Sequence, residues 1–137
     1  MNNTTESTNG LVFIKSPNDV KTTADRLVQV LKDKDMAIIA RIDHSAAALK
    51  IGENLRDTEL IIFGNPNVGT ALMQTSQSAA IDLPMKALVS KDQNNQVWIT
   101  YNDPHYLAKR HNIEGKDAVL NKISDALNKF SNAAIAD

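Results

Sequence analysis

Residues 85–102, MKALVSKDQNNQVWITYN, decide the fold class, because they contain two strand-like runs joined by a polar turn. Residues 85–90 and 97–102 are rich in apolar and β-branched side chains, whereas residues 92–96 are polar, which is typical of a hairpin. Strands joined by so short a connection run antiparallel. The hairpin therefore predicts a sheet that is at least partly antiparallel.

Apolar runs before the hairpin predict three more strands, at residues 11–15, 36–44 and 60–63. The last of these is short and continuous, as expected for a strand in the middle of a sheet. Helical spacing of apolar residues predicts helices that begin near residues 17, 66 and 104, and a last helix over 120–130. The order is β-α-β-β-α-β-β-α-α, so we predict an α+β fold with a single mainly antiparallel sheet and helices on one face.

The three earlier helices share a start signal, in which a capping residue stands before a proline that suits the first helical position. It occurs at Ser16-Pro17, Asn65-Pro66 and Asp103-Pro104. Strict alternation over residues 36–44 places Ile38, Ala40, Ile42 and His44 on one face of a strand, opposite Arg41 and Asp43.

The composition indicates one ordinary domain. The chain has 137 residues, of which 42% are hydrophobic. We expect a disordered segment at 1–10, MNNTTESTNG, and a single domain at 11–137. The formal net charge is -1, which argues against a nucleic-acid partner. The absence of cysteine excludes disulfides, thiolate nucleophiles and cysteine-based metal sites.

The expected location follows from two absent features of the sequence. No apolar stretch approaches the roughly 20 residues of a membrane span. Residues 1–10 lack the basic and apolar regions of a signal peptide. We therefore expect a cytoplasmic protein, with a periplasmic or secreted mature form as the alternative.

Four motifs occur in a fixed order: ARIDH at 40–44, FGNP at 63–66 with Gly69-Thr70 and Leu72-Met73, IDLP at 81–84 with Lys86, and YNDP at 101–104. With these motifs the sequence resembles the DUF302 domains, a mostly prokaryotic group of unknown function, over nearly the whole chain from residue 11. The resemblance implies a compact α+β fold that is commonly dimeric, and it implies no established reaction or cofactor. We therefore expect a homodimer.

The candidate ligand-binding residues lie at predicted strand ends and helix starts, namely Arg41, Asp43, His44, Asn65, Gly69, Lys86, Asn102, Asp103 and His105. The helices that open at Asn65-Pro66 and Asp103-Pro104 offer free N–H groups that can hold an anion. The two helix starts would converge on one pocket if both strands end at the same edge of the sheet. Ordinary capping is the alternative at each position.

Several candidates also have structural interpretations. His44 fits a buried histidine satisfied by a backbone carbonyl, or a general base at a strand end. Gly69 would permit a close approach to the backbone, such as that of a ligand. Arg41 and Lys86 can neutralise an acidic ligand, or pair with Asp43 or Asp82. No HExxH motif is present, so local spacing predicts no metal site.

Three functions are compatible with these residues. The first is an accessory module that holds a small anionic ligand or a protein partner in a groove lined by Asn65, Asn102, Asp103 and His44. The second is a structural homodimer that covers a sheet edge or the surface around Trp98, since Trp98 and Tyr101 fall on opposite faces of one strand. The third is an enzyme that uses His44 or His105 as acid or base. The lack of a catalytic signature favours the first.

Overall fold

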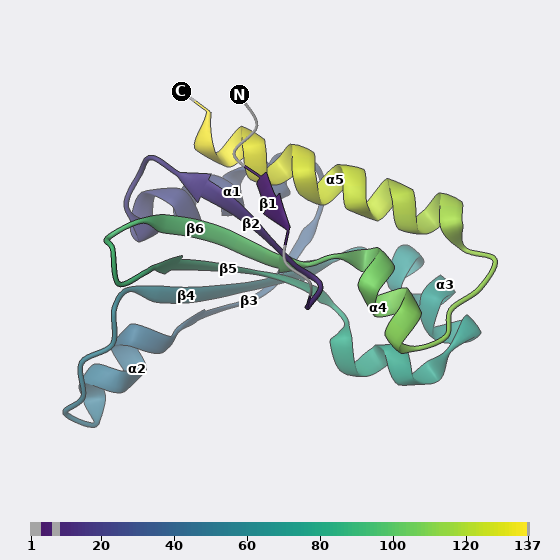
Figure 1. The fold of residues 1–137 in the computed structure, drawn as a ribbon, viewed down its shortest axis with the longest axis horizontal. Helices are drawn as coiled ribbons and strands as arrows, with labels where there is room; N and C mark the ends of the chain where they lie inside the picture. The colour runs from purple at the N-terminus through teal and green to yellow at the C-terminus, as the bar shows by residue number, and fades with distance from the viewer. Residues whose placement is uncertain (1–3, 7–8, 137) are drawn as a thin grey trace.

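The computed structural model describes residues 4–6 and 9–136. Its strands form one six-stranded sheet in the order β1-β2-β6-β5-β4-β3, and each neighbouring pair is antiparallel (Figure 1). The strands are β1 (Thr4–Glu6), β2 (Leu11–Ser16), β3 (Ala37–Asp43), β4 (Thr58–Gly64), β5 (Met85–Lys91) and β6 (Val97–Asn102). The helices are α1 (Val20–Asp33), α2 (His44–Lys50), α3 (Pro66–Thr75), the 3-10 helix η1 (Gln77–Asp82), α4 (Pro104–Arg110) and α5 (Asp117–Ile135).

The predicted α+β class and antiparallel sheet are confirmed. Helices α1 and α5 pack against each other on one face of the sheet (Figure 1). Alternate strand residues point toward these helices and form the core together with helix residues. Its fully buried members include Ile14, Ile61, Val89 and Ile99 of the strands and Leu27 and Leu31 of α1. The shorter helices lie at the two ends of the sheet, with α2 at one end and α3, η1 and α4 at the other (Figure 1).

The start of α1 differs from the prediction. Asp19, rather than Ser16, caps the helix, and its side chain accepts a hydrogen bond from the backbone N–H of Thr22 at 2.7 Å. Ser16 ends β2 and is buried, with its hydroxyl 2.7 Å from that of Thr23. The contact with Thr23, together with the pairing of Ser16 with Val97 of β6, keeps Ser16 in the strand, so the helix begins later.

The predicted alternation along β3 is wrong because the strand contains a β-bulge. Ile38 pairs with Phe63 and Ala40 pairs with Ile62, so Ile39 is an extra residue in β3. The bulge reverses the facing of the residues that follow it. Ile38 therefore packs against the core, whereas Ala40 lies on the opposite face.

The segment predicted to be disordered contains a short strand. Residues 4–6 form β1, which pairs with β2 at the edge of the sheet. Residues 1–3, 7 and 8 of the predicted segment lie outside the described residues.

Candidate functional site

The topology separates the candidate residues into two groups at opposite ends of the sheet. Because β3 and β4 are antiparallel, Arg41, Asp43 and His44 lie where β3 finishes and β4 begins. Strands β4 and β6 both run antiparallel to β5, so they finish together at the other end. That end carries Asn65, Gly69, Lys86, Asn102, Asp103 and His105. The predicted groove that joins His44 to Asn65, Asn102 and Asp103 is therefore wrong.

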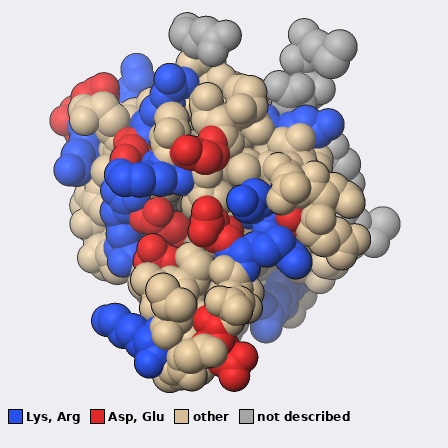
Figure 2. All heavy atoms as spheres, turned by 90° about the vertical axis from the view of Figure 1, so that its left-hand side faces the viewer, with Lys and Arg blue, Asp and Glu red and all other residues tan. Residues whose placement is uncertain are grey.

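A polar hollow of about 340 Å³ lies at the β3 end, where acidic and basic side chains intermingle (Figure 2). Its lining includes Arg41, which contacts Glu59 through Nε and Asp25 through Nη2, the latter at 3.0 Å. The hydrogen bond with Glu59 is the main cause that raises the pKa of Arg41. Arg41 is therefore engaged by two carboxylates, instead of the predicted pairing with Asp43 or Asp82.

Lys21 and Asp25 form another ion pair next to this hollow. Lys21 bonds Asp25 at 2.7 Å, and hydrogen bonds from Lys21 and then Arg41 lower the pKa of Asp25. The hollow is also lined by the carboxylates of Asp43, Asp57 and Glu59. Because carboxylates outnumber cations around this hollow, its electrostatics disfavour an anionic ligand.

Asp43 and His44 mark the junction of β3 with α2. The Asp43 carboxylate accepts hydrogen bonds from the Ser45 hydroxyl at 2.7 Å and the Ala46 N–H at 2.9 Å, and these bonds lower its pKa. Asp43 is thus the cap of α2. His44 begins the helix and is exposed. Of the two interpretations of His44, the buried histidine is therefore wrong, because the strand ends one residue before it.

At the opposite end, Asn65 and Asp103 act as ordinary helix caps. Asn65 accepts from the Asn67 N–H at 3.0 Å, and Asp103 accepts from the N–H of the exposed His105 at 2.9 Å. Both helix starts lie at the same end of the strands, as the hypothesis of a shared pocket required. Strand β5 separates them by two strand spacings, about 10 Å, and neither cap lines the cavity found there.

Gly69 and Lys86 have structural surroundings at this end. A Cβ at Gly69 would lie 3.9 Å from Met73 Cε and 4.0 Å from Leu83 Cδ1, which is ordinary contact. No neighbouring part of the described chain therefore approaches Gly69 so closely that a glycine is required. Lys86 Nζ donates to the carbonyls of Asp82 at 3.3 Å and Pro84 at 3.1 Å. These hydrogen bonds from Lys86 stabilise the connection that leads into β5, in which the Leu83–Pro84 peptide is cis.

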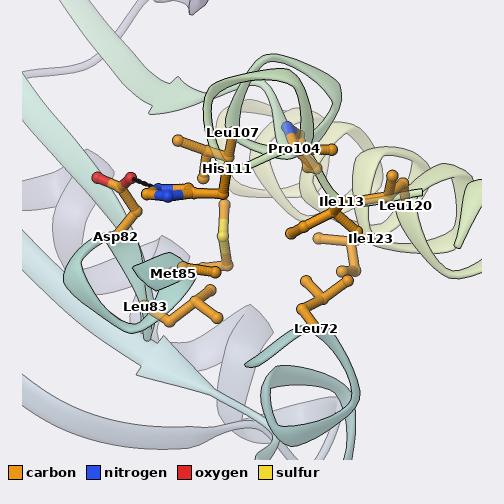
Figure 3. Close-up of a pocket in the computed structure, with 12 residues that line it drawn as sticks. Leu72, Asp82, Leu83, Met85, Pro104, Leu107, His111, Ile113, Leu120 and Ile123 are labelled. Carbon is orange, nitrogen blue, oxygen red and sulfur yellow. Dashed lines mark hydrogen bonds and ion pairs between the residues drawn. The ribbon is translucent and has the colours of Figure 1, made fainter. Parts of the chain in front are cut away.

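Sequence reasoning missed a hydrogen-bonded chain at the same end. His111 Nδ1 lies 2.8 Å from Ser78 Oγ. The other ring nitrogen, Nε2, lies 2.6 Å from Asp82 Oδ2 (Figure 3). Arg110 also reaches Asp82 Oδ2, at 3.2 Å. Ser78 and Asp82 stand 33 and 29 residues before His111. Local spacing carries no signal for such a group, although Asp82 falls inside the IDLP motif.

An apolar cavity lies beside the His111 ring (Figure 3). Its lining includes Leu72, Leu83, Met85, Leu107, Leu120 and Ile123. The cavity volume is about 10 Å³, which holds no more than one water molecule. Neighbouring helices fill the space, so the cavity does not offer a preformed site for a larger molecule.

The sheet face that points away from α1 and α5 carries apolar side chains that are only half-buried. We call it the open face and define it by Phe13, Leu60, Ile62, Leu88 and Trp98. The Phe13 and Trp98 rings meet edge to face, with their centroids 6.0 Å apart. Tyr101 belongs to the core and is 4% exposed. The prediction that Trp98 and Tyr101 separate in this way is confirmed.

A second apolar surface lies on α2 and the loop after it, which project from the end of the sheet (Figure 1). We call residues 44–56 the α2 arm. Its exposed apolar residues are Leu49, Ile51 and Leu55, with exposed fractions of 68%, 78% and 49%. Ile42, on β3, is 38% exposed and lies on the same side of the sheet as the open face.

Within residues 4–6 and 9–136, no helix has the length and apolar character needed to cross a membrane. Over the same ranges, no cluster of three or more histidine, cysteine, aspartate or glutamate side chains has a geometry suited to a metal ion.

The architecture defines an α+β domain in which one antiparallel sheet packs against two helices. The chain belongs to the DUF302 family, since the family model described as "Domain of unknown function DUF302" matches residues 12–130. The fold is similar to the crystal structure of an uncharacterized conserved protein DUF302 from Bacillus stearothermophilus, with a TM-score of 0.72. That similarity covers 92% of this chain and 95% of the other at 17% identity.

Curated relatives from Brucella are also similar. Over 104 residues the chain is 44% identical to "Fluoride-specific ion channel FluC 1" of Brucella suis biovar 1 (strain 1330) and to "Fluoride-specific ion channel FluC 2" of Brucella melitensis biotype 1 (strain ATCC 23456). The match covers 76% of this chain, but 41% and 38% of those proteins. The chain therefore spans about two fifths of the length of these relatives.

Proposed function

We propose that this chain is an accessory binding module that acts as a homodimer, in which each copy covers the open face of the other. The observation that carries the proposal is the half-buried apolar surface that spans adjacent strands of the sheet. Contiguous exposed apolar surface of this kind marks interaction sites on proteins. Fully burying an exposed leucine or phenylalanine contributes about 1.5–3 kcal/mol, and covering a half-buried one contributes part of that.

The face is a better contact surface than the sheet edge. Strand β3 lies at one edge, where its unpaired backbone groups would otherwise invite another strand. The bulge at Ile39 interrupts the regular spacing of those groups. Ladder formation between two copies along β3 is therefore disfavoured, while the open face stays available.

A second copy is the partner that best matches this face. The chain carries two separate apolar surfaces, the half-buried open face and the exposed α2 arm. In a two-fold dimer, a surface contacts either the same surface of the partner or a different one, and in the second case the same contact occurs twice. A two-fold dimer can thus place each arm against the other copy's open face and remove both surfaces from water.

Leu88 tests the proposal, because it pairs with Leu60 on one side and Thr100 on the other, near the middle of the open face. We expect the wild type to have the mass of a dimer in size-exclusion chromatography with light scattering, and Leu88→Lys to have the mass of a monomer. Ile81→Lys is the matched control, since Ile81 is 76% exposed on η1, away from the face. A monomeric wild type, or a dimeric Leu88→Lys variant with native circular dichroism, would contradict the proposal.

The Brucella relatives support the accessory part of this proposal. Their names describe fluoride-specific ion channels, and a segment similar to this chain makes up about two fifths of their length. The described residues contain no helix suited to crossing a membrane. We infer that the domain is a module that other proteins combine with a membrane channel.

A further inference from the structure

We propose that Ser78 is a nucleophile, activated by His111 and Asp82, that accepts acyl groups from small esters with an apolar acyl chain. This site lies at the end of the sheet that carries η1 and α4, apart from the open face of the proposed dimer. The proposed role of Ser78 rests on the hydrogen-bonded chain from Ser78 through His111 to Asp82. Of these three residues, only Ser78 is exposed.

The chain of bonds fixes the tautomer of the imidazole. A carboxylate only accepts hydrogen bonds, so the 2.6 Å contact between Asp82 Oδ2 and His111 Nε2 places the proton of a neutral ring on Nε2. His111 Nδ1 then carries a lone pair, and it faces Ser78 Oγ at 2.8 Å. The serine hydroxyl therefore donates to the histidine, which is the arrangement of a nucleophile with its general base.

The ring nitrogens exchange the roles that they have in serine proteases, where Nε2 faces the serine and Nδ1 faces the aspartate. The three roles themselves are the same. Asp82 orients the ring and stabilises the imidazolium, His111 moves the proton, and Ser78 attacks. Geometry and roles define such a group, and the order along the chain does not.

The surroundings hold the base in place. The His111 side chain is 6% exposed and packs beside the apolar cavity, and the Asp82 side chain is 15% exposed. Arg110 contacts the Asp82 carboxylate at 3.2 Å. The base is thus shielded while the nucleophile remains open to solvent, so a substrate reaches Ser78 without entering the 10 Å³ cavity.

Ile81 indicates the kind of acyl group. In a 3-10 helix the side chains at positions i and i+3 lie on the same face, which places Ile81 along the same side of η1 as Ser78. Ile81 is 76% exposed. An apolar acyl chain bound to Ser78 can cover Ile81 and remove its surface from water.

The reaction balances without a cofactor. Ser78 Oγ attacks the carbonyl carbon of the ester while its proton moves to His111 Nδ1. The bond to the leaving alcohol breaks, and the alcohol oxygen takes that proton, which leaves an acyl ester on Ser78. Water then attacks the acyl carbon and gives a proton to Nδ1. That proton returns to Ser78 Oγ as the carboxylic acid departs.

The test uses p-nitrophenyl butyrate and p-nitrophenyl acetate with the full chain, with mass spectrometry to locate the acyl group. We expect the adduct on Ser78 and its loss in Ser78→Ala. Ser76→Ala is the matched control, since the Ser76 hydroxyl lies 3.3 Å from that of Ser78 on the same segment. General-base catalysis contributes on the order of 100-fold or more, so Asp82→Asn or His111→Gln should slow acylation by about that factor.

Two further readouts keep the proposal falsifiable if the buried variants lose stability. Ile81→Ala leaves the hydrogen-bonded chain untouched and should reduce the preference for butyrate over acetate. An absent adduct, equal labelling of Ser76 and Ser78, or an unchanged acylation rate in a folded Ser78→Ala variant would overturn the proposal.

Discussion

Two glycines have opposite roles at the scale of single residues. Gly69 lies inside α3, and a Cβ there would make ordinary contact with Met73 and Leu83. Gly10 has a φ of 83°, and a Cβ there would overlap the ring of Tyr106. Glycine is therefore required by the backbone and by packing at position 10, and by neither at position 69.

Substitution by alanine separates these roles. We expect Gly69→Ala to raise the free energy of unfolding by up to about 1 kcal/mol, because alanine is the better helix former. Gly10→Ala should lower it by more than that, because the left-handed backbone and the Tyr106 ring both oppose a side chain. Urea denaturation measures both values. A Gly69→Ala variant less stable than the wild type would contradict the packing seen around α3.

Asp92 links the β5–β6 turn to Trp98. Its carboxylate accepts hydrogen bonds from Trp98 Nε1 at 2.9 Å, Gln96 N–H at 3.0 Å and Asn94 N–H at 2.8 Å, and the bond from Trp98 is the largest cause that lowers its pKa. Since the folded pKa lies below the unfolded one, the stabilisation is present above the unfolded pKa. It is lost as the pH falls through the folded pKa.

The single tryptophan reports this titration. We expect the fluorescence of Trp98 to change at a pH below 3.8, the ordinary pKa of aspartate, as Asp92 takes up a proton. Asp92→Asn should remove that transition, because the amide does not titrate. A fluorescence midpoint at or above 3.8 in the wild type would contradict the lowered pKa.

At the scale of elements, local signals predicted more than long-range ones. The capping residue and proline at Asn65-Pro66 and Asp103-Pro104 predicted the starts of α3 and α4, because a cap and its proline are adjacent in sequence. The same signal misplaced the start of α1, where Ser16 is held by Thr23. The bulge in β3 depends on pairing with β4, which no alternation pattern along one strand reveals.

In the candidate site too, local sequence signals predicted the helix caps but not the contacts between distant residues. The sequence identified Asn65 and Asp103 as polar groups at helix starts, and both are caps. For His44 it offered a buried histidine or a general base, and it gave His111 no role, although His44 is exposed and His111 is buried. The partners of His111 lie 29 and 33 residues away, so only the packing of η1 against α4 brings them together.

At the scale of the whole molecule, the sheet keeps three surfaces apart. The charged hollow lies where β3 ends, and the hydrogen-bonded group of Ser78, His111 and Asp82 lies beyond the start of β5. The open face lies between these two ends. Substitutions on one surface should therefore act independently of the others, as expected for sites without shared partners. Leu88→Lys should abolish dimers without changing the acylation of Ser78.

The α2 arm decides how two copies fit together. If each arm packs against the partner's open face, Ile51→Lys should weaken the dimer as Leu88→Lys does, although Ile51 is 78% exposed within one copy. A lysine at that position costs little in a monomer, because it replaces surface that already contacts water. The effect should therefore appear only as a loss of association.

Dilution measures that loss. Trp98 lies on the open face, so its emission should shift as the wild-type dimer dissociates, and the melting temperature should rise with protein concentration. In Ile51→Lys the shift should occur at a higher concentration, and Ile81→Lys should behave as the wild type. If Ile51→Lys dissociates at the wild-type concentration while Leu88→Lys is monomeric, the two open faces contact each other directly and the arms stay outside the interface.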